Sequence, residues 1–229
     1  MNPIRVDPML TKIRMTGDEL TRGLYREVAP LHAVVAVTSE PVPFSERKKL
    51  LYRAVETGEE WSRAQWECAW FRITGEVPQR YEPEELFLGI DIDGEGCLFD
   101  EGGTPIRGIT NVSSEFERSL GLPGKRYVPF EDGSFGTDRI DLWLEAGNND
   151  LLGNRHSGKV LQLGIYYCNK ARRELVYDYK FLLSLAEGLS DKDPQKLWIL
   201  YALEKVAVQV SADDSEQKTA GLREILRPC

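Results

Sequence analysis

The stretch from Trp61 to Thr110 constrains the fold of this chain most, because its apolar residues recur with a period of two. In Cys68–Thr74 that period places three apolar residues on one face: Ala69, Phe71 and Ile73. Glu85–Ile92 repeats the pattern with Leu86, Leu88 and Ile90. Such alternation is typical of antiparallel strands with one buried face. The sequence therefore predicts a mainly β structure.

Two short turns separate three of the expected strands. Asp93-Gly94 follows the second strand of this stretch, and Gly102-Gly103 follows the next one. Two-residue turns with positive φ angles favour Gly, Asn and Asp. We expect both turns to be hairpin connections of a meander.

The wider region from residue 31 to residue 169 is predicted to be a jelly-roll-like antiparallel β-sandwich of the galactose-binding-like kind. No helices of the parallel-sheet type intervene between its strands, which favours that architecture. One helix is expected within Pro41–Tyr52, where Ser45 would be its N-cap. The expected strands are Leu31–Thr38, Cys68–Gly75, Glu85–Ile92, Gly96–Asp100, Arg139–Glu145 and Val160–Cys168.

The residues on either side of this region have a helical pattern. Residues 1–30 are expected to form an N-terminal arm with a short capped helix at Thr16–Gly23. Residues 170–229 are expected to form a helical connector with a C-terminal helical hairpin, because apolar residues recur there at three and four positions. Its first helix would end near Gly188, and its second would begin at Asp193-Pro194 and reach about Val210. Their apolar stripe needs a partner to be buried.

Charge and cysteine content exclude several functional classes. The chain of 229 residues has a formal net charge of -8, which argues against a phosphate-binding surface, so we expect no nucleic acid as a partner. Neither a secretory signal nor an apolar run long enough to span a bilayer is apparent, so no membrane partner is expected. The four cysteines are far apart and show no metal-binding spacing, which favours free thiols in the cytoplasm.

Three blocks of sequence, in order, resemble the N-terminal domain of the α-mannosidases of glycoside hydrolase family 38, of the cytosolic and vacuolar type. The first block combines Trp66, Trp70 and Ile73 with Leu86–Gly96 and Gly103–Gly108. The second block is Asp141–Gly153 followed by Leu161–Gly164, and the third is Leu175–Asp178. The resemblance covers most of the chain from about Leu31 onward. A Trp-rich strand or a Gly-rich turn alone would be weak evidence for this family, whereas three blocks in the same order are more specific.

This resemblance implies that residues 170–229 lead toward a catalytic domain that this chain lacks. That domain opens with a His-x-His-x-Asp-x-x-Trp motif that carries zinc in the family, and no part of this sequence matches it. A catalytic zinc needs about three convergent protein ligands, whereas His32 and His156 have no neighbouring ligand at suitable spacing. We therefore expect no cofactor in this chain, zinc in the missing catalytic domain, and no catalytic residue here.

The resemblance also implies the function and the partners. The full-length enzyme would hydrolyse α-D-mannosides in the cytoplasm, while the isolated chain, a fragment of a glycoside hydrolase, would be inactive. The partners implied are the catalytic domain of the same enzyme and mannose-containing glycans. Homo-oligomerisation is a further expectation.

A few residues are candidates for contact with carbohydrate or with another domain. Trp61 and Trp66 lie in a polar segment, where their rings would be exposed and could stack on a sugar. Asp91, Asp93 and Glu95 form the most suggestive acidic cluster, although a turn with solvated acids explains it as well. Asn148 and Asn149 belong to a loop that we interpret as structural.

Two alternative hypotheses remain open at this point. A freestanding carbohydrate-binding module predicts saturable sugar binding by the chain and no large apolar patch on its helices. A structural or assembly domain predicts no sugar binding and an exposed helical apolar stripe that marks a partner surface.

Overall fold

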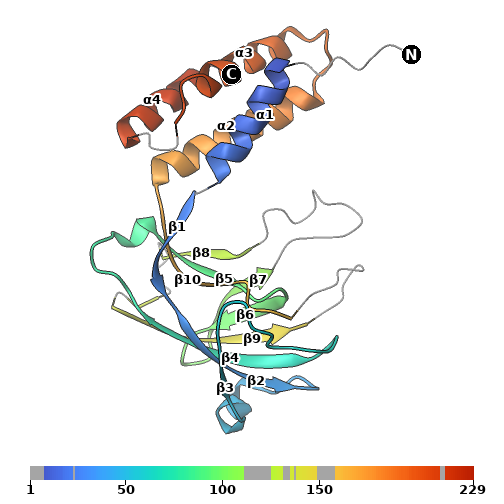
Figure 1. The fold of residues 1–229 in the computed structure, drawn as a ribbon, viewed down its shortest axis with the longest axis vertical. Coiled ribbons are helices and arrows are strands. Elements are labelled where there is room, and N and C mark those ends of the chain that lie inside the picture. Colours follow the sequence, from blue (N-terminus) through green and yellow to red (C-terminus); the bar gives the residue numbers. More distant parts are fainter. Residues whose placement is uncertain are drawn as a thin grey trace. The chain divides into compact units, whose positions relative to one another are not determined.

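The computed structural model describes residues 8–22, 24–110, 125–130, 135–136, 138–148, 158–211 and 215–229. The chain forms two compact units (Figure 1). Unit 1 comprises Met1–Arg26 and Cys168–Cys229, and unit 2 comprises Glu27–Tyr167. The predicted division of the chain at residues 30 and 169 stays a prediction, but the N-terminal residues belong to the same unit as the C-terminal helices.

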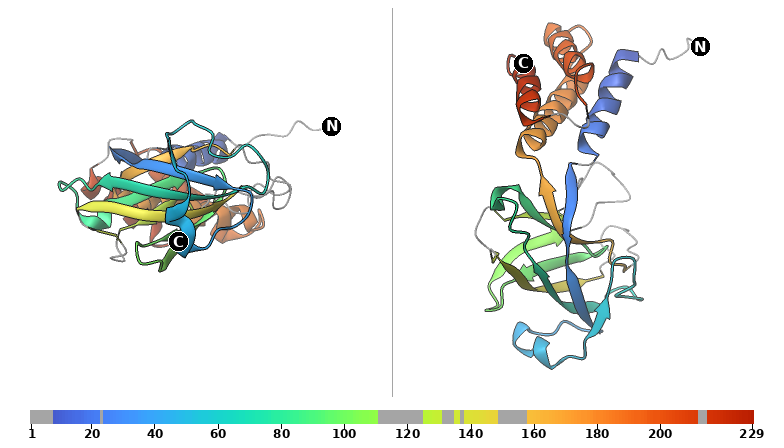
Figure 2. Two further views of the ribbon diagram at one scale, coloured as in Figure 1. Left: turned by 90° about the horizontal axis from the view of Figure 1, so that it is seen from below. Right: turned by 60° about the vertical axis from the view of Figure 1, so that its left-hand side comes forward.

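Two antiparallel sheets form the β-sandwich, as the period-two pattern predicted. The four-stranded sheet has the order β1-β10-β5-β8, and the six-stranded sheet has the order β3-β2-β4-β9-β6-β7. The four strands of the first sheet are β1 (Tyr25–Pro30), β10 (Gln162–Cys168), β5 (Leu86–Asp91) and β8 (Tyr127–Pro129). The six strands of the second are β3 (Arg53–Val55), β2 (His32–Thr38), β4 (Cys68–Glu76), β9 (Arg139–Gly147), β6 (Glu95–Phe99) and β7 (Pro105–Thr110). In the left view of Figure 2, blue β2, teal β4 and yellow β9 lie side by side.

The alternating residues of the strands meet in the core between the sheets. From β4, the three residues Ala69, Phe71 and Ile73 are each 1% exposed or less, and Leu88 of β5 is fully buried opposite them in the same cluster. Burial of this apolar surface is the main term that holds the two sheets together. The predicted faces of both strands are confirmed, and so is the predicted mainly β class.

One predicted turn is wrong in its role. Gly102-Gly103 joins β6 to β7, which pair with each other, so this hairpin is confirmed. Asp93-Gly94 instead connects β5 of the four-stranded sheet to β6 of the six-stranded sheet. The prediction of a turn at these residues is nevertheless correct, since Asp93 has a φ of 49° and its N–H donates to Asp91 Oδ1 at 3.0 Å. Which strands pair with each other, however, depends on contacts between residues that are far apart in the sequence.

The segment before β3 covers the outer face of the six-stranded sheet. A short 3₁₀ helix, η1 (Phe44–Lys49), replaces the α-helix predicted within Pro41–Tyr52, and Ser45 lies inside it rather than at its N-cap. Phe44 packs edge-on against Trp70 at a centroid distance of 5.6 Å. Trp143 is 4% exposed and lies under the Arg47 guanidinium. Both tryptophans are therefore buried, but in a small aromatic cluster outside the main core.

The described residues of unit 1 form four helices: α1 (Pro8–Thr21), α2 (Lys170–Gly188), α3 (Pro194–Ala207) and α4 (Glu216–Leu226). The predicted end of α2 at Gly188 and the Asp193 cap of α3 are confirmed, because the Asp193 carboxylate accepts the N–H of Gln195 at 2.9 Å. Helix α1 begins at Pro8, earlier than the expected Thr16, and α4 was not predicted. Among the described residues, no helix is both long and apolar enough to cross a membrane.

Side-chain contacts tie these helices to one another. The Tyr179 hydroxyl of α2 donates to the Ile13 carbonyl of α1 at 3.0 Å. Arg223 of α4 forms ion pairs with both Glu174 and Asp178 of α2. Helix α1 is therefore an integral part of the helical unit.

Candidate functional site

Trp61 is part of the core, contrary to the expectation of an exposed ring. Its indole is 2% exposed and packs edge-on against Phe71 at 5.5 Å. The indole N–H donates to the Ile92 carbonyl at 2.6 Å, so both the apolar body and the polar atom are satisfied internally. Trp61 therefore has no free ring face for a ligand.

The acidic cluster does not assemble into a site. Asp91 is 4% exposed, and its carboxylate forms an ion pair with Arg126 at 3.1 Å. That arrangement is not the solvated turn that we considered for this residue. Asp93 lies in the turn between the sheets, and Glu95 begins β6. Within the ranges that the structure describes, no group of three His, Cys, Asp or Glu side chains is placed to hold a metal ion.

The loop of residues 61–67, called the Trp66 loop below, is held by Asn148. This asparagine is 5% exposed, and its Nδ2 donates to Ser62 Oγ at 2.7 Å and to the Ala64 carbonyl at 3.1 Å. Its backbone accepts the Trp66 N–H at 2.8 Å and donates to the Glu67 carbonyl at 2.9 Å. Asn148 thus holds the loop through its side chain and its backbone, whereas Asn149 lies outside the described residues.

Glu67 closes the Trp66 loop from the inside. One carboxylate oxygen lies 2.8 Å from Ser62 Oγ and accepts the N–H groups of Arg63 and Ala64 at 2.8 and 3.1 Å. Burial alone would raise the pKa of this carboxyl, but these three hydrogen bonds together outweigh it and hold the pKa below its ordinary value. Glu67 is therefore ionised at neutral pH and organises the loop around its charge.

Trp66 is the residue that this framework presents to solvent. Its side chain is 57% exposed, and its φ is 70°, a left-handed conformation that bulky residues rarely adopt. Such a conformation costs about 1–3 kcal/mol and persists only where the surroundings determine it strongly. The hydrogen bonds from Asn148 and Glu67 supply that determination, so the exposed ring is held in a defined place.

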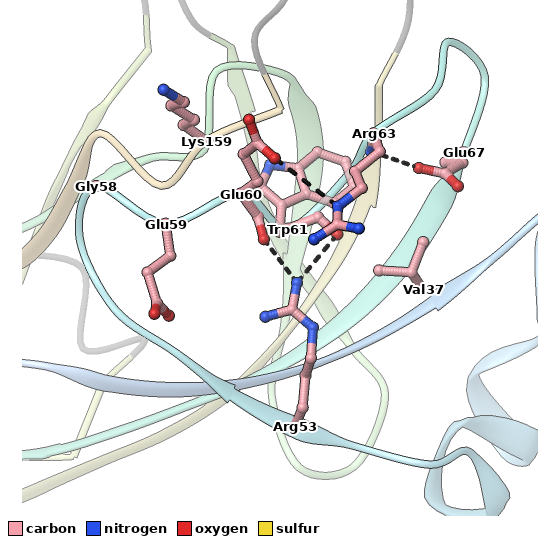
Figure 3. A pocket seen from close by; sticks show the side chains of 9 residues that line it. All are labelled: Val37, Arg53, Gly58, Glu59, Glu60, Trp61, Arg63, Glu67 and Lys159. Atoms are coloured by element: carbon pink, nitrogen blue, oxygen red, sulfur yellow. Dashed lines mark hydrogen bonds and ion pairs between the residues drawn. The ribbon is translucent and has the colours of Figure 1, made fainter.

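A surface cavity of about 690 Å³ lies beside this loop (Figure 3). Arg53 of β3 reaches the Glu60 carbonyl at 2.6 Å, and Arg63 Nε lies 3.8 Å from the Glu60 carboxylate. In Figure 3 the side chains of Glu59 and Lys159 point away from Trp61. The charged side chains that line the cavity are three bases and three acids: Arg53, Arg63, Lys159, Glu59, Glu60 and Glu67. Their formal charges balance.

Two kinds of chemistry find no support in the described residues. The pKa values of all four cysteine thiols are raised by burial, and that of Cys168 reaches about 11. A nucleophilic thiol needs the opposite shift, and all four thiols are free, as predicted. His32 is the exposed first residue of β2, as expected for a strand-end histidine, and His156 lies outside the described residues. Among the described residues, His32 is not part of any group of three His, Cys, Asp or Glu side chains that could hold a zinc ion.

The helical unit has exposed apolar faces. On α2, Tyr177, Phe181 and Leu185 follow one another at intervals of four residues and are 59%, 68% and 41% exposed. A spacing of four places them on one side of the helix, opposite the buried Val176 and Tyr179. On α3 and just after it, the exposed apolar residues are Leu197, Trp198, Tyr201 and Val208. The face of α3 that is buried within the helical unit consists of other residues: Ile199, Leu200, Ala202, Leu203 and Val206.

Sequence reasoning missed most of the cavity. Arg63 and Glu67 belong to the same polar segment as Trp66, so the run of charges around this tryptophan was a usable signal. Arg53 lies on a three-residue strand and Lys159 is far away in the sequence. Only the fold brings these two residues to the loop.

Comparison with known proteins places this fold in a family. The family described as "Alpha-mannosidase, jelly roll domain" matches residues 28–200. The human protein "Alpha-mannosidase 2C1" is 24% identical over 209 residues, which are 86% of this chain and 19% of that protein. The mouse protein of the same name is 22% identical over 208 residues, with the same coverage. The chain thus spans about a fifth of the length of these curated relatives. Two sheets in jelly-roll arrangement and a family match over most of the sequence lead to one conclusion: the chain belongs to the α-mannosidase jelly roll domain family.

Proposed function

We propose that this chain is the non-catalytic N-terminal portion of an α-mannosidase, in which it supports the catalytic part of the enzyme. Family membership supports this proposal, and so does the coverage of only 19% of the length of two proteins named α-mannosidases. The full-length enzyme would hydrolyse α-D-mannosides. Zinc and the catalytic groups would lie in the part of the enzyme that corresponds to the remaining length.

The observation that carries the supporting role is the exposure of apolar side chains on α2 and α3. Phe181 and Trp198 are 68% and 74% exposed, although each lies on a helix whose opposite face is well packed. Burying one large apolar side chain stabilises an assembly by roughly 1.5–3 kcal/mol. Exposed apolar patches on a domain mark surfaces where a partner packs. The partner that we propose is the catalytic part of the same enzyme, with self-association into an oligomer as a second use of the same faces.

The free cysteines support a cytoplasmic location for this enzyme. Disulfides form and persist in oxidising compartments, whereas reduced thiols are typical of the cytosol. Cys68 and Cys97 are half-buried and Cys229 is exposed, and all remain free.

The first test is the mass of the native, untagged product in its own cells, detected with an antibody raised against this chain. We expect a band several times heavier than the 26.0 kDa of the present chain. A band at 26.0 kDa would contradict the proposal, because no catalytic part would then be attached.

The second test concerns the helical faces in that longer product. Phe181→Ser and Trp198→Ser are expected to lower its thermal stability and its hydrolysis of p-nitrophenyl α-mannoside, while the isolated chain keeps its own stability. Met15→Ser is the control, because Met15 is 66% exposed on α1, away from both faces in the sequence. Unchanged stability and activity in the Phe181 and Trp198 variants would contradict the docking of these faces.

A further inference from the structure

A second surface cavity, of about 360 Å³, borders the segment that joins β4 to β5. Val77, Tyr81 and Leu86 line it from that segment and from the start of β5. Phe130 and Phe135, which follow β8, also line it and pack together at a centroid distance of 5.1 Å. Ligand cavities typically measure about 300–1,000 Å³ and have mostly apolar walls with a few polar groups. The volume and the walls of this cavity agree with that description.

The charged part of the lining is acidic. Glu82 and Glu84 are exposed, and the described residues that line the cavity include no Lys, Arg or His. The Gln79 amide, which also lines it, donates to the Val77 carbonyl at 3.1 Å. The cavity therefore combines apolar walls with two formal negative charges.

Backbone donors around the cavity are used within the protein. The Val77 N–H donates to the Asp138 carbonyl at 3.0 Å. The Glu82 N–H donates to Glu85 Oε2 at 3.3 Å, and the two prolines of the lining have no N–H group. Carboxylates only accept hydrogen bonds, so they match a ligand that donates. An ammonium or guanidinium group only donates, whereas a sugar or another neutral polyol also needs donors from the protein.

A contact between a cation and an aromatic ring already exists beside the cavity. The guanidinium carbon of Arg80 lies 4.9 Å from the centroid of the Tyr81 ring, although Arg80 is not part of the lining. The quadrupole of an aromatic ring attracts cations, and the attraction is stronger where water is excluded. The aromatic walls and the carboxylates therefore both favour a positively charged ligand.

We infer that this cavity is a binding site for a small organic cation. The apolar body of the ligand lies against the aromatic walls, and its ammonium or guanidinium group meets Glu82 and Glu84. This site goes beyond the proposed function and does not rest on it, because its described residues all belong to unit 2.

The test is a titration of the chain of residues 1–229 with three ligands of similar shape, followed by the backbone amide resonances. Benzylamine is protonated at neutral pH, benzyl alcohol is neutral and benzoate is an anion. We expect benzylammonium to shift the amides of Gln79, Tyr81 and Gly136 saturably, with a dissociation constant of about 1 mM. Benzyl alcohol should bind at least about threefold more weakly, and benzoate more weakly still. Added salt should weaken the binding of benzylammonium but not that of benzyl alcohol.

Variants of the acidic residues test the role of charge. Glu82→Gln and Glu84→Gln together should weaken benzylammonium binding at least about threefold and leave benzyl alcohol binding unchanged. Arg80→Gln should strengthen benzylammonium binding, because it removes a like charge beside the site. Glu59→Gln is the matched control, since it removes an exposed carboxylate that lines the other cavity, and it should change nothing.

Three results would overturn the inference. The first is that benzylammonium leaves the amides of the lining unshifted, and the second is that benzyl alcohol binds as tightly as benzylammonium. The third is that the variant with both glutamines binds benzylammonium as tightly as the parent chain. The mass of the native product decides the proposed function separately.

Discussion

The side-chain amide of Asn148 donates to the hydroxyl of Ser62 at 2.7 Å, and this bond joins the end of β9 to a loop 86 residues earlier. The pair is buried, so neither group has solvent as an alternative partner. Removal of one partner leaves the other group unsatisfied, which costs more than the bond itself contributes. This bond fixes the loop that carries Trp66.

Asn148→Ala should therefore lower the free energy of unfolding by about 1–3 kcal/mol. Urea unfolding of the chain measures this change. Ser62→Ala should cost a similar amount, and the double variant should cost less than the sum of the two. Additive effects would show that the two groups do not act as a pair. Gln195→Ala, at an exposed position of α3, should be neutral.

The Glu67 carboxylate makes loop stability depend on pH. Its pKa is lowered in the folded state, so its contribution is complete above the ordinary value of 4.5 and is lost as pH falls through the lower folded pKa. Glu67→Gln should destabilise the chain clearly at neutral pH. The difference between parent and variant should shrink once the pH is below 4.5. Glu84→Gln, at an exposed residue, is the control, and a difference that is constant with pH would contradict the role of the charge.

The φ of 70° at Trp66 predicts a reversal of the usual order of glycine and alanine. Glycine normally destabilises relative to alanine because it loses more backbone entropy on folding. In the left-handed region, a Cβ atom costs roughly 1–2 kcal/mol. Trp66→Gly should therefore be more stable than Trp66→Ala in thermal unfolding. At Leu51, which is 95% exposed and whose φ is not positive, alanine should be the more stable variant.

The sequence predicted the strands well where one face of each strand is buried in the core. In Cys68–Thr74 the apolar residues Ala69, Phe71 and Ile73 recur with a period of two, and β4 places all three in the core while Trp70 lies on the other face. The missed strands β3 and β8 have three residues each, too few for a period to be visible. Strand β7 was also missed, because it begins with Pro105, and a proline in a short apolar run argues against a strand.

The candidate site was harder to predict, because neighbours in the sequence have opposite environments. Trp61 and Trp66 lie in one polar segment, yet only the Trp66 side chain remains exposed. The Trp61 indole is buried in the core, where its N–H donates to the Ile92 carbonyl. Likewise, Asp91 is buried because Arg126 lies beside it, which no local pattern shows. Such differences depend on residues that the fold brings together from far away.

In the helical unit, the Tyr179 hydroxyl tests how firmly α1 is attached. It is fully buried and donates to the Ile13 carbonyl at 3.0 Å, so Tyr179→Phe removes a bond between α2 and α1. We expect a loss of about 1 kcal/mol in the free energy of unfolding. Tyr177→Phe on the same helix, where the ring is 59% exposed, should have no measurable effect. Equal effects of the two variants would show that the hydroxyl bond contributes nothing.

In the four-stranded sheet, position 89 requires a glycine because the Tyr166 ring lies directly over it. A Cβ atom at Gly89 would lie 2.4 Å from both the Tyr166 ring and Gln162 Nε2, and the ring cannot move aside as a flexible chain end can. Tyr166 is also held by its hydroxyl, which donates to Glu27 at 3.2 Å, and by an edge contact with Tyr127 at 5.5 Å. Gly89→Ala should therefore destabilise the chain by about 1–3 kcal/mol, as overpacking does in other cores. Gly108→Ala on exposed β7 is the matched control, since its nearest neighbour would be the Gly96 carbonyl at 3.9 Å. Thermal unfolding of the two variants distinguishes them, and equal stability would mean that Tyr166 yields without cost.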